Sequence, residues 1–203
     1  MRQVHDVCGL PVAVFRPDMI MAHSGYAGQL NVPDMITRLL LSVVATGIAP
    51  NSFYRAGHQH SAQAHFDGLP VDFVAQFITR IGTQSAVGFH TYNVVNPHDD
   101  GVSLDQFVDW LVEAGNPINR ICDHDKWISQ FESALRNLPE NLRQHSVLGV
   151  LDAFRRPMEP EAGSAVPCSR YRQATEDMHF AIPHLSASLI HRYSSGLHAL
   201  KLV

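Results

Sequence analysis

Histidines and carboxylates are the first candidates for chemistry in this 203-residue chain, which contains 13 histidines. The segment HQHSAQAH brings His58, His60 and His65 together, and His98–Asp100 and Asp123–Asp125 place imidazoles beside carboxylates. Zinc and iron sites use such side chains. These groups lie in separate segments and lack the i, i+4 spacing of helical ligands. We therefore expect no metal site and interpret the segments as solvated polar loops.

Two residues have the chemistry of nucleophiles. Cys122 precedes Asp123 and His124, but neighbours in sequence do not make a catalytic dyad, because catalytic partners meet in space. A structural thiol is the alternative interpretation. Ser24 lies in HSGYAG, which does not match the G-x-S-x-G pattern of a nucleophile elbow. Neither residue defines a catalytic site by itself.

The strand-to-loop junction near the start of the chain is the third candidate. Leu10–Phe15 is a short continuous apolar run, typical of a strand covered on both faces in a parallel sheet. Pro17 ends the run, and Gly25 and Gly28 mark the loop that follows. Ligands of open α/β sheets bind beyond the carboxyl ends of the strands. The pattern predicts either a ligand-binding loop or an ordinary strand–helix crossover.

Periodic apolar residues predict the elements that must position this loop. Ser103 and Gln106 predict a capping box at the start of one helix. We expect helices at 33–46, 70–81, 103–114, 124–137, 139–154 and 186–200, strands at 10–15, 90–97 and 118–122, and an exposed connector at 156–169. This order predicts an α/β fold whose C-terminal half is mostly helical.

Composition limits the classes of function. The chain is 45% hydrophobic and 17% charged, which is ordinary for a globular protein. A net charge of −4 leaves no basic surplus to displace counterions, so we expect no nucleic-acid partner. Cys8, Cys122 and Cys168 form no CxxC motif or disulfide framework. With no visible secretory signal and no apolar run long enough to span a bilayer, these features favour a soluble cytoplasmic protein without a membrane partner.

Several segments resemble the reductase domain of bacterial carboxylic acid reductases. They are LPVAVFRPDMI, YAGQLN, FDGLPVDFVA, TYNVVNPHDDGVSLDQFVDWLVEAG, QHSVL and IPHLSASLI, and together they cover essentially the whole chain in order. The resemblance implies a Rossmann-type fold of the extended short-chain dehydrogenase kind. It implies NADPH as the cofactor and, as the partner, an acyl thioester on the phosphopantetheine arm of a carrier domain. In this family the thioester is reduced to an aldehyde.

The family's catalytic pair, Tyr-x-x-x-Lys, is absent from this sequence. The positions four residues after the five tyrosines hold Leu30, His58, Asn96, Thr175 and Leu197. Neither G-x-G-x-x-G nor G-x-x-G-x-x-G is present to hold a pyrophosphate. In the family the pair lies on the helix before the strand that corresponds to Pro11–Phe15. The chain therefore resembles the C-terminal part of a Rossmann-type reductase domain, and we expect no catalytic residue within it.

The resemblance assigns binding roles to two short groups. The residues that border the cofactor nicotinamide correspond to Arg16, Pro17, Asp18 and Met19. The loop beside the substrate corresponds to His23, Ser24, Tyr26 and Gln29. We expect residues 1–100 to be a partial Rossmann-type region with the last sheet strands and crossover helices. Residues 101–203 would then form a mostly helical substrate-binding subdomain.

Three interpretations of the function remain open. The chain is a truncated thioester reductase that is inactive alone, or it is half of a split reductase that a separate N-terminal half completes. The third interpretation is a non-enzymatic binding module, such as a docking unit for a carrier protein or a histidine-based metal binder. An upstream reading frame that encodes the Gly-rich turn and Tyr-x-x-x-Lys would distinguish a decayed reductase gene from a split enzyme.

Overall fold

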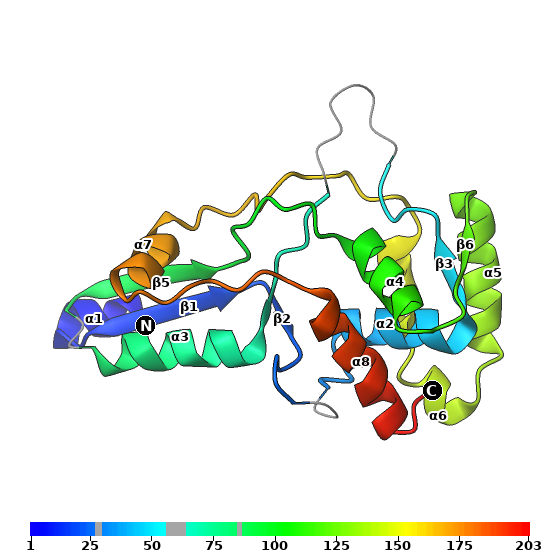
Figure 1. Ribbon diagram of the computed structural model, residues 1–203. Coiled ribbons are helices and arrows are strands. Elements are labelled where there is room, and N and C mark those ends of the chain that lie inside the picture. The colour runs from blue at the N-terminus through cyan, green and yellow to red at the C-terminus, as the bar shows by residue number, and fades with distance from the viewer. Residues whose placement is uncertain (27–29, 56–63, 85–86) are drawn as a thin grey trace.

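The structure is a computed structural model, and it describes residues 1–26, 30–55, 64–84 and 87–203 (Figure 1). The strands are β1 (Val12–Pro17), β2 (Met19–Met21), β3 (Ile48–Pro50), β4 (Gly68–Pro70), β5 (Phe89–Val94) and β6 (Asn119–Ile121). The helices are α1 (Arg2–Cys8), α2 (Met35–Thr46), α3 (Val71–Thr83), α4 (Leu104–Glu113), α5 (His124–Arg136), α6 (Glu140–Arg143), α7 (Ser169–Asp177) and α8 (Ala187–Ala199). A 3-10 segment, η1, covers Val147–Phe154.

Three parallel strand pairs organise the fold, namely β1 with β5, β2 with β4, and β3 with β6. The first pair runs from Val12 opposite Phe89 to Pro17 opposite Val94. Parallel strands need a long crossover, and the connection between β1 and β5 contains α2 and α3. Because parallel strands end at the same edge, the segments that follow Pro17 and Val94 leave from one side of the pair.

Two hydrophobic clusters form the core. The sheet cluster joins β4, α3, β5 and α7, and the rings of Phe77, Tyr92 and Tyr171 meet edge to face within it. The helical cluster joins α2, α4, α5, η1 and α8 around Trp127 and Phe131, which are fully buried. Figure 1 shows the two clusters at opposite ends of an elongated molecule.

The chain passes between the two clusters five times. The passages lie between residues 15 and 21, 66 and 69, 94 and 104, 158 and 168, and 182 and 185. As a result, α2 belongs to the helical cluster, although it precedes residue 100, and α7 returns to pack on β5. The division near residue 100 stays a prediction, and each cluster contains residues from both sides of it.

The local signals located most helices and their starts to within about two residues, but they misassigned the side chains that cap them. Ser103 is the residue before α4, yet its side chain makes no capping hydrogen bond, so the predicted capping box is wrong. Its carbonyl oxygen only accepts the first backbone bond, from the Phe107 N–H at 3.1 Å. Asp34 is the residue that caps α2, by accepting the Thr37 N–H at 2.8 Å.

The single helix predicted at 139–154 is also wrong. Ser146 caps a new start by accepting the Leu148 N–H, and Val150 has non-helical angles of φ −128° and ψ 18°. The segment therefore divides into α6 and η1. At the other end of the predicted connector, α7 begins at Ser169 and was not expected.

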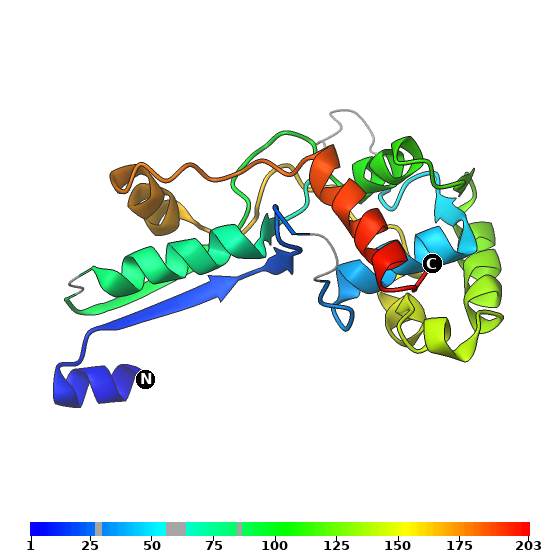
Figure 2. The same cartoon turned by 60° about the horizontal axis from the view of Figure 1, so that its bottom comes forward.

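β1 is less covered than its apolar sequence predicts. Val12–Phe15 are only half-buried, and Arg16 is exposed. One edge of β1 pairs with β5, whereas no strand in the described residues pairs with its other edge. Ahead of it, α1 projects from the end of the molecule and exposes 52% of Val4 and 84% of Val7 (Figure 2). The prediction of a strand covered on both faces is thus wrong for these 203 residues.

Tyr193 of α8 joins the C-terminal helix to the start of the chain, and it generates a test of this fold. Its hydroxyl oxygen accepts the Ala22 N–H at 2.8 Å, and both residues are buried. We expect Tyr193→Phe to lower the free energy of unfolding by about 1–3 kcal/mol, because the Ala22 N–H is left buried without a partner. Urea unfolding followed by circular dichroism measures this loss.

Tyr171→Phe is the matched control for that experiment. The Tyr171 hydroxyl is equally buried, but it has no hydrogen-bond partner among the described residues. Its removal should leave the stability unchanged or slightly higher. Equal losses in the two variants would contradict a specific role of the Ala22 contact.

Candidate functional site

The residues predicted to border a nicotinamide lie at the carboxyl end of β1. Arg16 and Pro17 close the strand, Asp18 stands between β1 and β2, and Met19 opens β2. Arg16 and Asp18 are exposed, whereas Pro17 and Met19 are half-buried. Asp18 and Met19 line a half-enclosed cavity of about 300 Å³, which we call the β2 cavity. Its position matches the place where ligands bind in open α/β sheets.

The wall of the β2 cavity is mostly apolar. Its apolar residues come from α2, from the segment before β4, from the end of η1 and from the segment after η1, and they include Met35, Leu39, Phe66, Phe154 and Met158. Gly68 leaves room for the Phe66 ring, because a Cβ atom at Gly68 would clash with that ring. Phe66, from a segment far from β1 in sequence, thereby contributes to the cavity wall.

The polar residues of the β2 cavity are Asp18, Tyr54, His65, Asp67, Glu159 and Glu161. Tyr54 accepts the Leu104 N–H at 3.3 Å, and burial chiefly raises the pKa of its hydroxyl to about 12. The Tyr54 hydroxyl therefore keeps its proton at neutral pH. Desolvation, and then the negative charge of Asp67, raise the pKa of Asp18.

His65 and Asp67 form an ion pair at the wall of this cavity. The His65 Nε2 lies 2.9 Å from the Asp67 Oδ1, and only 3% of the His65 side chain is exposed. Burial acts to lower the pKa of His65, but the hydrogen bond and charge of Asp67 outweigh burial and raise it. The other members of the predicted cluster, His58 and His60, lie outside the described residues.

The residues predicted to lie beside the substrate gather at the N-terminus of α3. Ser24 donates its backbone N–H to Asp72 at 2.9 Å and its hydroxyl at 2.5 Å. His23 Nδ1 accepts the Gly25 N–H at 2.8 Å, and the His23 ring packs edge-on against Tyr26 with 4.6 Å between centroids. Ser24 lines a separate hollow of about 200 Å³ with Asp72. Gln29 lies outside the described residues.

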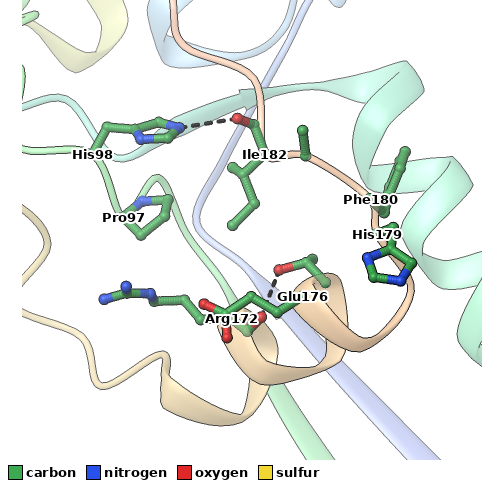
Figure 3. A pocket seen from close by; sticks show the side chains of 9 residues that line it. Pro97, His98, Arg172, Glu176, His179, Phe180 and Ile182 are labelled. Atoms are coloured by element: carbon green, nitrogen blue, oxygen red, sulfur yellow. Dashed lines mark hydrogen bonds between the residues drawn. The ribbon is translucent and has the colours of Figure 1, made fainter.

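The pairs of neighbouring histidines and aspartates in the sequence do not pair in space. Figure 3 shows His98 at a shallow depression of about 580 Å³ beside α7, where its Nε2 lies 3.1 Å from the Ile182 carbonyl oxygen. Asp100 contacts His184 Nδ1 at 2.7 Å instead of His98. The rings of His98 and His184 stack 3.6 Å apart. These contacts fasten the segment before α8 to the loop after β5.

The second such group is used for helix capping. Asp123 accepts the Lys126 N–H at 2.7 Å and caps α5. His124 Nε2 lies 3.0 Å from the Phe154 carbonyl oxygen. Asp123 and His124 are thus engaged elsewhere, and neither residue is directed as a base at the exposed thiol of Cys122.

Two further properties concern the described residues as a whole. None of their His, Cys, Asp and Glu side chains gather in a group of three or more that would hold a metal ion. Within the same residues, every helix is too short or too polar to cross a bilayer.

Relatives of known sequence cover the entire chain. The family model described as "Male sterility protein", an NAD-binding domain, matches residues 1–78. A carboxylic acid reductase of Mycobacterium marinum is 52% identical over 100% of this chain and 18% of its own length. The isonitrile lipopeptide synthase of Mycobacterium tuberculosis is 47% identical over 100% of this chain and 9% of its own length.

Solved structures give the same result. The reductase (R) domain of a nonribosomal peptide synthetase from M. tuberculosis superposes with a TM-score of 0.90 at 47% identity, over 100% of this chain and 49% of that one. The terminal R domain of the myxalamid pathway gives a TM-score of 0.71 at 27% identity, over 96% of this chain and 46% of that one.

The chain is homologous over its whole length to the reductase domains of carboxylic acid reductases and nonribosomal peptide synthetases. It corresponds to a C-terminal portion of these domains, and it spans about half the length of the solved R domains and 18% of the length of the carboxylic acid reductases. The predicted fold class, the C-terminal part of a Rossmann-type extended short-chain dehydrogenase fold, is confirmed. As a reductase family with an NAD-binding domain, it implies a nicotinamide cofactor.

The wall of the β2 cavity opposite Asp18 and Met19 could not be located from the sequence. Tyr54, Asp67 and Met158 come from segments without periodic apolar residues, so no local signal marked them. FDG, at Phe66–Gly68, did belong to a segment that resembles the family, and it precedes β4 directly. The position of FDG directly before β4 was the one sequence feature that pointed to this wall.

The Ser24–Asp72 contact predicts how the stability of this domain responds to acid. Burial acts to raise the pKa of Asp72, but the hydrogen bonds from Ser24 outweigh it and lower the pKa below 3.8. A carboxyl whose pKa is lower in the folded state stabilises the protein above its ordinary pKa. This contribution is lost as the pH falls through the lowered value.

We therefore expect Asp72→Asn to reduce the loss of stability below about pH 5 by up to about 1 kcal/mol, a small effect because the carboxylate is partly exposed. Urea unfolding at a series of acidic pH values measures it. Ser24→Ala removes one of the two hydrogen bonds and should weaken the same pH dependence in part. Superimposable pH profiles of wild type and Asp72→Asn would refute the assignment.

Proposed function

We propose that this chain is the C-terminal, substrate-side part of an NADPH-dependent thioester reductase. Such an enzyme would release an acyl group from the phosphopantetheine arm of a carrier domain as an aldehyde. Identity of 52% to a carboxylic acid reductase over 100% of the chain is the observation that carries this proposal. The TM-score of 0.90 to a reductase domain of a peptide synthetase supports it.

The residues present do not by themselves fit a complete NADPH site. The sequence contains no Gly-rich turn for the pyrophosphate. Asp72 already occupies the N-terminus of α3, the helix end nearest the predicted site residues, and Asp18 and Asp67 add negative charge beside it. We infer that the nucleotide-binding half of the reductase fold must supply the cofactor site and the Tyr-x-x-x-Lys pair.

The proposed division of labour leaves binding and positioning to this chain. When bound, the cofactor supplies the hydride that reduces the thioester carbonyl. Arg16, Pro17, Asp18 and Met19 would border the nicotinamide from the carboxyl end of β1. The loop that contains His23, Ser24, Tyr26 and Gln29 would lie beside the substrate. Without the other half these residues have no catalytic partner, so the 203 residues alone would be inactive.

The N-terminal end of this chain offers the surface for that other half. β1 keeps one edge without a paired strand among the described residues, and α1 exposes Val4 and Val7. Apolar side chains and an open strand edge are the features that a further strand and helix would cover. The partner would be the nucleotide-binding half of a reductase domain, on the same or on a separate polypeptide.

The three free cysteines, Cys8, Cys122 and Cys168, agree with a reducing cytoplasm.

Completion of the fold tests the proposed function. The N-terminal half of the M. marinum reductase domain is fused ahead of residue 1, and NADPH oxidation is followed with an acyl-pantetheine thioester. We expect the fusion to consume NADPH and form aldehyde, whereas the 203-residue chain does neither. A fusion with Phe in place of the tyrosine of Tyr-x-x-x-Lys is the inactive control. Micromolar NADPH binding by the chain alone, or a well-folded but inactive fusion, would overturn the proposal.

The same assay tests the proposed contact surface. In the fusion, Val7→Asp should reduce activity at least about tenfold, because it places an unpaired charge in the contact between the two halves. Val150→Asp is the control, since Val150 is 42% exposed on η1, at the other end of the molecule. The surface is misplaced if both variants keep full activity. Equal melting temperatures would exclude misfolding as the cause of any loss.

A further inference from the structure

The β2 cavity has the shape and lining of a site for a short apolar chain. Its volume of about 300 Å³ is at the lower end of the range for small-molecule sites. Met19, Met35 and Met158 contribute flexible, polarisable side chains that adapt to different apolar occupants. Leu39 and Phe154, at 2% and 4% exposure, form a more rigid part of the wall.

The charge around this cavity is negative. Two of its carboxylates have basic partners, since the Asp67 Oδ1 lies 2.9 Å from the His65 Nε2 and Glu159 pairs with Arg55 at 2.8 Å. Asp18 and Glu161 also line the cavity, and neither has an ion-pair partner among the described residues. An occupant that brings a further carboxylate would therefore meet uncompensated negative charge at close range.

Tyr54 adds a directed hydrogen-bond donor to the apolar wall. Its oxygen accepts the Leu104 N–H at 3.3 Å, and the hydroxyl proton is donated to no group in the described residues. A hydroxyl or carbonyl oxygen on the occupant would accept that proton. The cavity thus combines an apolar lining, a neutral donor and two carboxylates that form no ion pair within the described residues.

We propose that the β2 cavity receives the acyl chain of the thioester. The cavity would select chains whose end away from the thioester is neutral or cationic over chains that end in a carboxylate. The proposal rests on the proposed function, because the reductase assignment is what makes an acyl chain the expected occupant. Asp18 and Met19 connect the cavity to the reaction, since they are also the residues proposed to border the nicotinamide. The charge complementarity follows from Asp18 and Glu161.

Binding of three matched thioethers to the 203-residue chain tests this selectivity without any reduction. S-hexyl-pantetheine, S-(6-aminohexyl)-pantetheine and S-(5-carboxypentyl)-pantetheine have similar length and no reducible carbonyl. We expect titration calorimetry at neutral pH to give dissociation constants at least about tenfold weaker for the carboxylate chain than for the other two. Equal affinities, or a preference for the carboxylate, would overturn the inference.

Variants assign the selectivity to Asp18 and Glu161. The double variant Asp18→Asn and Glu161→Gln should reduce the ratio of the dissociation constants of the carboxypentyl and hexyl chains severalfold. The double variant Asp6→Asn and Glu113→Gln is the matched control, because it removes the same charge, and both residues are exposed and do not line the cavity. An equal reduction of this ratio in the control would show a general charge effect and would count against the cavity.

The outcome separates this inference from the proposed function. An inactive fusion protein together with the expected order of affinities would reject the reductase assignment and retain the selective cavity. An active fusion that reduces hexanoyl-pantetheine and adipoyl-pantetheine equally well, with equal affinities for the thioethers, would retain the reductase and reject the inference.

Discussion

The parallel pairing of β1 with β5 is the constraint on which the rest of the structure depends. Strands that run in the same direction cannot be joined by a tight turn, so the chain between Pro17 and Phe89 must leave one end of the pair and return to the other. That excursion contains β2, α2, β3, β4 and α3. The β2–β4 pair forms as the chain leaves and returns. Its position beside the carboxyl end of β1 creates the β2 cavity.

The break between β1 and β2 separates residues that are close in sequence. Asp18 and Met19 turn toward the β2 cavity, whereas Ser24, five residues after Met19, is held by Asp72 at the start of α3. Ala22 lies between them, and Tyr193 of α8 fixes its backbone. The two groups that one family motif assigned to cofactor and substrate thus stand on opposite sides of a fixed point.

Helices with a long apolar stripe could be predicted from the sequence, whereas most of the short elements could not; β6, predicted at 118–122, is the exception. α3, α4 and α5 bury one face over about three turns, and this period is visible in the residues alone. β2, β3 and β4 have three residues each, which is too few to show a period. α7 was missed because it buries only Tyr171 and Thr175. For the site, Asp18 and Met19 were found through the resemblance, whereas Tyr54 and Met158 reach them only by long-range packing.

The five passages of the chain between the two clusters have a mechanical consequence. Domains that open and close about a hinge are joined by a few segments that absorb the rotation. Here five segments would have to bend together, and one of them is tied to its neighbour by His184 and Asp100 at 2.7 Å. The two clusters should therefore move little relative to each other, and loosening of one cluster should strain the other. The fit of a ligand at their junction would therefore depend on side-chain rearrangement more than on closure of the two clusters.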